Sequence, residues 1–178
     1  LSMSKKIILL VLLIIIISLP IKISKEKPII NTISTIFNNK NGKTKVIDPI
    51  GKLEIPKINL TKYLYDQNSS LNNIEENVTI LKETISKNEN GLMILAAHSG
   101  DSDKAFFNDL DKLTIGDYIN LKYKGKEYLY IVTTIFEQEK KGYINLDIKD
   151  ESQLFLTTCS KAPHKQLIIE TKKIVLTP

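Results

Sequence analysis

The longest apolar run of the chain lies near its N-terminus. Lys5 and Lys6 precede a run from Ile7 to Ile23 that is apolar except at Ser18 and Lys22. These 17 residues would extend about 25 Å as a helix, which is at the short end for crossing a bilayer. A cleaved signal peptide has a similar pattern, but residues 18–24, at the end of this run, form a poor small-x-small cleavage site. We therefore expect a transmembrane helix at residues 7–23, with residues 1–6 as a cytoplasmic stub and the remainder outside the cell.

Residues 24–47 form a polar segment rich in Lys, Asn, Ser and Thr, which we interpret as a stalk. Its apolar residues between Ile29 and Phe37 recur at helical spacing, which favours an amphipathic helix. A flexible tether fits the composition equally well. Asp48-Pro49 and Gly51 then mark a boundary, after which we expect one folded domain at residues 48–178.

From residue 48 onward, short apolar runs alternate with turn signals. Leu92–Ala97 is apolar throughout, as expected for a strand buried on both faces. Lys124-Gly125-Lys126 predicts a hairpin, and Ala105–Leu113 predicts one or two helical turns with apolar residues on one face. The other predicted strands are Lys52–Ile55, Leu60–Tyr65, Asn77–Leu81, Tyr118–Tyr123, Glu127–Phe136, Leu154–Thr158 and Gln166–Leu176. Many short strands at this spacing predict an all-β fold, a closed barrel with short helical insertions.

The positive charge of the chain is concentrated in its N-terminal part. Residues 1–47 carry a net charge of +7, whereas residues 48–178 carry −2. A nucleic-acid-binding domain would carry its basic patch on the folded body, so this class is disfavoured. The basic N-terminal segment suits an anionic membrane surface. All 25 basic residues are Lys, and the sequence contains no Arg.

The chain contains one cysteine, Cys159, which excludes an intrachain disulfide and a cysteine-rich metal site. Cys159 directly follows the predicted strand Leu154–Thr158, and His98 directly follows the run Leu92–Ala97. Strand ends open into loops, where rigid scaffolds display reactive groups. A Cys–His pair suits nucleophilic acyl transfer. Taken singly, a buried Cys and a structural His are the more common readings, so the pair depends on the fold bringing the two together.

Four segments resemble sequence signatures of the sortase family. Leu156-Thr157-Thr158-Cys159 resembles the Leu-x-Thr-Cys signature, and residues 94–100 resemble the segment that carries the catalytic His, although Ala97-His98 stands where Gly-His is usual. Residues 105–117 resemble the segment that follows, and residues 51–58 resemble the opening strand. The four occur in the family's order, and the resemblance covers residues 50–176.

The resemblance implies an eight-stranded sortase-type β-barrel and a cysteine transpeptidase. Cys159 would be the nucleophile and His98 the acid/base partner. The substrate would be a Leu-Pro-x-Thr-Gly-like sorting signal of a surface protein or pilin, cleaved between Thr and Gly through a thioester. The acyl group would pass to an amine on a peptidoglycan precursor or a pilin lysine. We expect a monomer without cofactor, metal or nucleic acid, held in the membrane of a Gram-positive cell by a single span with the catalytic domain extracellular.

One departure from the family concerns the oxyanion donor, which in sortases is an Arg on the strand after the Cys. Gln166 stands at that position here. Its amide can donate two hydrogen bonds but carries no charge. We expect Gln166 to be the oxyanion donor. A strand would direct the neighbouring Lys165 to the opposite face, and we interpret His164 as an exposed loop residue.

Two rival functions remain open at this point. A non-catalytic sortase-like module would keep the barrel and bind sorting signals or pilins without turnover; the missing Arg favours it, and the retained Cys159 and His98 disfavour it. A hydrolytic cysteine peptidase would differ only in whether water or an amine attacks the thioester.

Overall fold

The structure, a computed structural model, describes residues 35–38, 44–82, 91–149 and 152–174. Within these ranges, no helix combines the length and the apolar character needed to cross a bilayer. The expected stub at residues 1–6 and the expected anchor at residues 7–23 both lie outside the described part of the chain.

The segment interpreted above as a stalk contains a short two-stranded sheet. β1 (Thr35–Asn38) pairs antiparallel with β2 (Thr44–Ile47), in the register Thr35↔Ile47. The amphipathic helix considered for this region is therefore wrong at Thr35–Asn38, while residues 24–34 lie outside the described ranges. Both strands contain β-branched residues, which favour a paired extended backbone over a helix.

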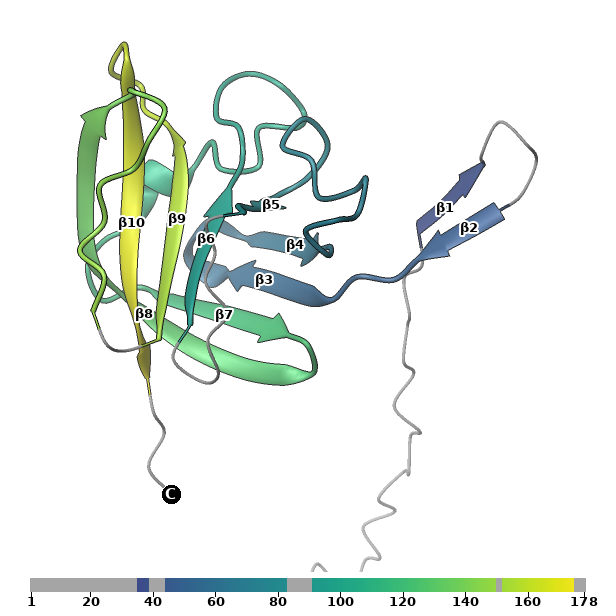
Figure 1. Cartoon of the computed structure of the whole chain (residues 1–178). Helices are drawn as coiled ribbons and strands as arrows, with labels where there is room; N and C mark the ends of the chain where they lie inside the picture. The colour runs from purple at the N-terminus through teal and green to yellow at the C-terminus, as the bar shows by residue number, and fades with distance from the viewer. Residues whose placement is uncertain (1–34, 39–43, 83–90, 150–151, 175–178) are drawn as a thin grey trace, which may run out of the picture. The chain divides into compact units, whose positions relative to one another are not determined.

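The body of the protein is one eight-stranded sheet that curls into a nearly closed barrel (Figure 1). Its strands are β3 (Gly51–Ile55), β4 (Leu60–Leu64), β5 (Thr79–Ile80), β6 (Leu92–Ala96), β7 (Tyr118–Tyr123), β8 (Lys126–Glu139), β9 (Gln153–Cys159) and β10 (Lys165–Ile174). They are arranged in the order β4-β3-β7-β8-β10-β9-β6-β5. The expected all-β class and eight strands are confirmed. Full closure of the barrel is not confirmed, because β4 and β5 are the two edges of this sheet and do not pair with each other in the part of the chain described here.

The parallel pairing of β6 with β9 explains the continuous apolar run at Leu92–Ala97. Every residue of β6 is buried, because alternate side chains enter two different apolar clusters. Met93 and Leu95 face the main core inside the barrel. Leu92 and Ile94 join Phe155 and Ile168 in a second cluster on the outer face. The side chains that cover this outer cluster are Leu81, Phe136, Ile144 and Leu146. The two strands that carry His98 and Cys159 at their ends are therefore packed on both sides.

The predicted connections are confirmed with one refinement. Between β6 and β7 the chain forms turns and a 3₁₀ helix, η2 (Leu110–Lys112), rather than an α-helix, and Phe107, Leu110 and Leu113 enter the main core. A second 3₁₀ helix, η1 (Pro56–Ile58), links β3 to β4. Lys124 and Gly125 form the tight β7–β8 turn with φ angles of 48° and 79°, the left-handed pair that matches the twist of a hairpin.

We expect a fragment of residues 48–178 to fold without the residues that precede it. All eight barrel strands and every member of the main core lie after residue 48. Circular dichroism should show a β-type spectrum and a single cooperative thermal transition. Aggregation of the fragment, or loss of its β signal, would place the domain boundary before Asp48.

Candidate active site

Two side-chain hydrogen bonds hold the ends of β6 and β9 together. The strands run in parallel with Ala96 opposite Thr157. Beyond that pair, the Thr158 hydroxyl donates to the Ala97 carbonyl at 2.8 Å, and the Ser99 hydroxyl donates to the Cys159 carbonyl at 2.7 Å. These bonds fix the residues on both sides of His98 against the segment that carries Cys159. The fold therefore brings the two strand ends side by side, which is the condition on which the Cys–His pair depends.

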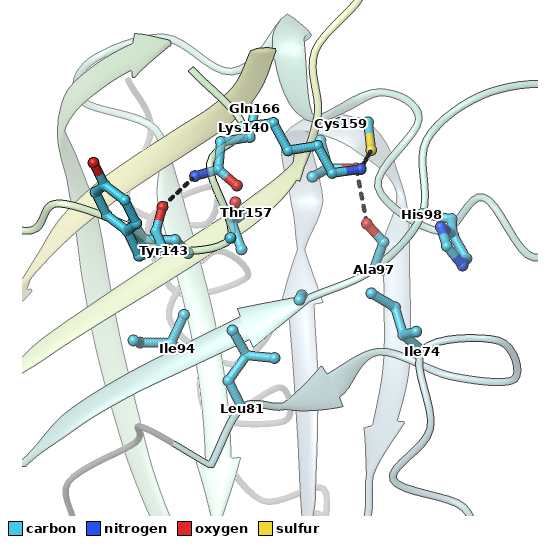
Figure 2. Close-up of a pocket in the computed structure, with 14 residues that line it drawn as sticks. Ile74, Leu81, Ile94, Ala97, His98, Lys140, Tyr143, Thr157, Cys159 and Gln166 are labelled. Carbon is cyan, nitrogen blue, oxygen red and sulfur yellow. Dashed lines mark hydrogen bonds between the residues drawn. The ribbon is translucent and has the colours of Figure 1, made fainter. Parts of the chain in front are cut away.

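Cys159 and His98 line one groove of about 780 Å³ (Figure 2). Cys159 is half-buried, and the His98 side chain is 38% exposed. The floor of the groove is largely apolar, with Leu81, Ile94 and Ile144 among its lining residues. A groove of this size, which combines apolar and polar lining side chains, suits a short extended peptide.

His98 has a carboxylate partner that the sequence did not indicate. Its Nε2 atom lies 3.2 Å from Oε1 of Glu75, in the loop between β4 and β5. The Glu75 side chain is 70% exposed, so the pair is open to solvent and screened by salt. A carboxylate in this place can orient the ring, as the third member of a catalytic triad does.

Gln166 lies beside Cys159, as its place in the sequence predicted. β10 pairs with β9 so that Gln166 is opposite Cys159, and its side chain lines the same groove. The Gln166 amide donates to the Tyr143 carbonyl at 3.2 Å (Figure 2). Lys165 does not line the groove, and its Nζ lies 3.8 Å from a Glu137 carboxylate oxygen. His164 is exposed, in a left-handed turn with φ 60°. The expectations for Lys165 and His164 agree with these positions.

Lys140 is a second site residue that sequence reasoning missed. It directly follows β8, and its Nζ lies 3.3 Å from Sγ of Cys159 (Figure 2). The sequence pattern had ended this strand at Phe136, three residues short of the observed end. The missing residues are polar and largely exposed, so they show no apolar alternation from which the strand could be extended.

A second depression of about 430 Å³ shares only Thr158 and Cys159 with the groove. Its lining includes the carboxylates of Asp101, Asp111 and Glu137. The ammonium of Lys161 contacts Asp111, and this hydrogen bond raises the pKa of Lys161. The Ser160 hydroxyl donates to Glu137. Cys159 therefore borders two depressions, one largely apolar and one acidic.

Comparison with known proteins agrees with this site. Residues 53–176 match the family model described as the Sortase domain. The structure of Streptococcus agalactiae sortase C1 in complex with MTSET is 26% identical, with a TM-score of 0.61, and the match covers 73% of this chain and 71% of that one. Streptococcus pneumoniae sortase C is 25% identical, with a TM-score of 0.62 and coverages of 73% and 70%.

A sortase D5 transpeptidase from Clostridium perfringens is also 25% identical, with a TM-score of 0.60, and the match covers 72% of this chain and 80% of that one. No curated protein matches the chain. The family model extends over most of the barrel and includes both His98 and Cys159. The chain therefore belongs to the sortase family, a family of cysteine transpeptidases.

Proposed function

We propose that this protein is a membrane-anchored transpeptidase that cleaves a Leu-Pro-x-Thr-Gly-like sorting signal and transfers the acyl part to a cell-wall or pilin amine. The observation that carries the proposal is the pair of hydrogen bonds, Thr158 to Ala97 and Ser99 to Cys159, that places Cys159 and His98 at one end of one groove. Two of the similar proteins add support: the structure of Streptococcus pneumoniae sortase C is described as giving insight into pilin substrate specificity, and the Clostridium perfringens protein is described as a transpeptidase.

In the proposed reaction, Cys159 attacks the carbonyl carbon of the substrate as a thiolate, with His98 as the imidazolium. The S–C bond forms, and the carbonyl π electrons move onto the oxygen. Collapse of this intermediate breaks the C–N bond, and the leaving nitrogen takes its proton from His98. An incoming amine then attacks the thioester and gives its proton to His98, and Cys159 leaves as the thiolate.

The two depressions suggest where each substrate binds. The apolar groove suits the sorting signal, because Leu81, Ile94 and Ile144 can contact the apolar side chains of an extended peptide. The acidic depression suits the amine acceptor, because carboxylates attract a cationic group toward the sulfur. In this arrangement the thioester would lie between its two reaction partners.

The absence of Arg favours one alternative function, a sortase-like module that binds sorting signals without turnover. A transfer experiment distinguishes the two functions. The purified protein is incubated with a Leu-Pro-x-Thr-Gly peptide library, with and without an added amine such as aminohexanoyl-lysine amide. The proposal predicts a mass-identified transfer product that depends on the amine. Saturable peptide binding without any cleavage would support the binding module, and hydrolysis unaffected by amine would indicate a peptidase.

For Gln166 we propose the role of a neutral oxyanion donor. One N–H of its amide contacts Tyr143, which holds the side chain in the groove, and the amide carries a second N–H. Gln166→Ala should lower the acylation rate by about tenfold to a thousandfold while peptide affinity changes little, because the donor acts mainly as negative charge develops.

The matched control for Gln166 is its neighbour Lys165, which lies outside the groove. Lys165→Ala should leave the acylation rate within about twofold, since an exposed ion pair contributes little. A large loss in Lys165→Ala with none in Gln166→Ala would reverse the assignment.

A further inference from the structure

Lys140 is held at the active site by its backbone as well as by its side chain. Its N–H donates to the carbonyl of His164 at 2.8 Å. His164 lies in the loop that joins Cys159 to Gln166, so this bond ties the end of β8 to the same loop. The Lys140 side chain then reaches the sulfur of Cys159, with Nζ 3.3 Å from Sγ. The contact therefore arises from a fixed strand end and not from a distant flexible segment.

The other lysines near Cys159 are directed toward carboxylates. Lys161 contacts Asp111, and Lys165 lies 3.8 Å from Glu137. Both carboxylates line the acidic depression, whereas Lys140 lines the groove that holds Cys159, His98 and Gln166. With no Arg in the sequence, the ammonium of Lys140 is the positive charge that contacts the sulfur within the described part of the chain.

We propose that Lys140 is a catalytic residue that supplies this positive charge to Cys159, first to the thiolate and then to the oxyanion. The inference rests on the proposed acyl transfer. An ammonium beside the sulfur favours the thiolate, which is the nucleophilic form. In the tetrahedral intermediate the oxyanion is bonded to the same carbon as that sulfur, so a short rotation of the lysine stem moves the ammonium from one to the other. A flexible stem and a compact charge make Lys suited to this motion.

This role divides the work of the missing Arg between two residues. Gln166 offers a neutral donor at a fixed position, and Lys140 offers the charge. Lys140 keeps all its protons throughout: His98 gives the proton to the leaving nitrogen and takes one from the incoming amine. Because Lys140 is exposed, part of its effect is screened by solvent and salt, which makes ionic strength a useful variable.

The test uses the full chain and three variants. Lys140→Met removes the charge at similar length, Lys140→Arg keeps it, and Lys141→Met removes the charge of the exposed neighbour as a control matched for net charge. Two rates are measured at one fixed pH: alkylation of the single cysteine by neutral iodoacetamide, and single-turnover acylation by a Leu-Pro-x-Thr-Gly peptide. Circular dichroism melts confirm that each variant is folded.

We expect Lys140→Met to alkylate about three- to tenfold more slowly than wild type, because it loses an exposed charge at the sulfur. Its acylation should slow by about thirtyfold or more, because the oxyanion also loses its charge partner. Lys140→Arg should recover most of both rates, and Lys141→Met should stay within about twofold of wild type. Raising the salt concentration should reduce the difference in both rates between wild type and Lys140→Met, because salt screens the ammonium.

If Lys140→Met matches Lys141→Met in both rates, the proposal is wrong. It is also wrong if Lys140→Arg is as slow as Lys140→Met, because charge would then not be the property that matters. If the proposed transfer reaction itself is wrong, the result is different, because no peptide of the library would acylate the wild-type protein. The alkylation comparison would still decide whether Lys140 acts on the sulfur, and equal alkylation rates would overturn its role there.

Discussion

Cys159→Ala should abolish peptide cleavage and amine transfer, with a loss of at least about a thousandfold in rate. The chain contains no second thiol that could take over the nucleophilic attack. The fold should survive, because Cys159 is only half-buried at the end of β9 and Ala fills part of its volume. Peptide cleavage is followed by chromatography, and melting curves compare the two proteins. Cleavage at the wild-type rate would exclude a thioester at Cys159.

His98→Ala should lower turnover by about a hundredfold to ten-thousandfold, because the leaving nitrogen loses its proton donor. The backbone at this position is held by Ala97 and Ser99 and by the bond from the Phe107 N–H to the His98 carbonyl, so the groove should keep its shape. The measurement is the steady-state rate of transfer, together with peptide affinity, which should change little.

The chain offers a matched control for His98 in its second histidine. His164 is exposed and lies outside both depressions, and Asn tolerates its left-handed backbone. His164→Asn should turn over at close to the wild-type rate. If His98→Ala and His164→Asn lost the same fraction of the transfer rate, the loss would be an indirect effect of removing an imidazole. His98 would then not be the acid/base residue.

The sequence carried most of the information needed for the barrel and for the two candidate catalytic residues. The apolar run Leu92–Ala97 could be recognised because both faces of β6 are packed, and this packing leaves no polar position in the strand. His98 and Cys159 stood out because each directly follows such a run. Their proximity depends on the parallel pairing of β6 with β9, which is formed across a long sequence separation and leaves no local signal.

The features that were missed lie where local pattern is weak. The last residues of β8 extend past the core and are polar, so the apolar pattern did not predict the end of the strand. The position of Lys140, directly after that end, could therefore not be predicted either. Glu75 reaches His98 from a loop, and no periodicity marks a loop residue. Around β1, the apolar residues from Ile29 to Phe37 suggested a helical stripe, although Asn41-Gly42 between two β-branched runs is a strong hairpin signal.

An intact-mass measurement of the wild-type protein with a Leu-Pro-x-Thr-Gly peptide library, in the absence of amine, directly tests whether Cys159 forms a thioester. We expect the protein mass to increase by that of the acyl fragment ending at Thr, with the adduct located on Cys159 by peptide mapping and removed by hydroxylamine, as a thioester requires. Addition of an amine should restore the original mass and release the transfer product. An unchanged mass across the whole library, or an adduct on any residue other than Cys159, would contradict the proposed thioester at Cys159.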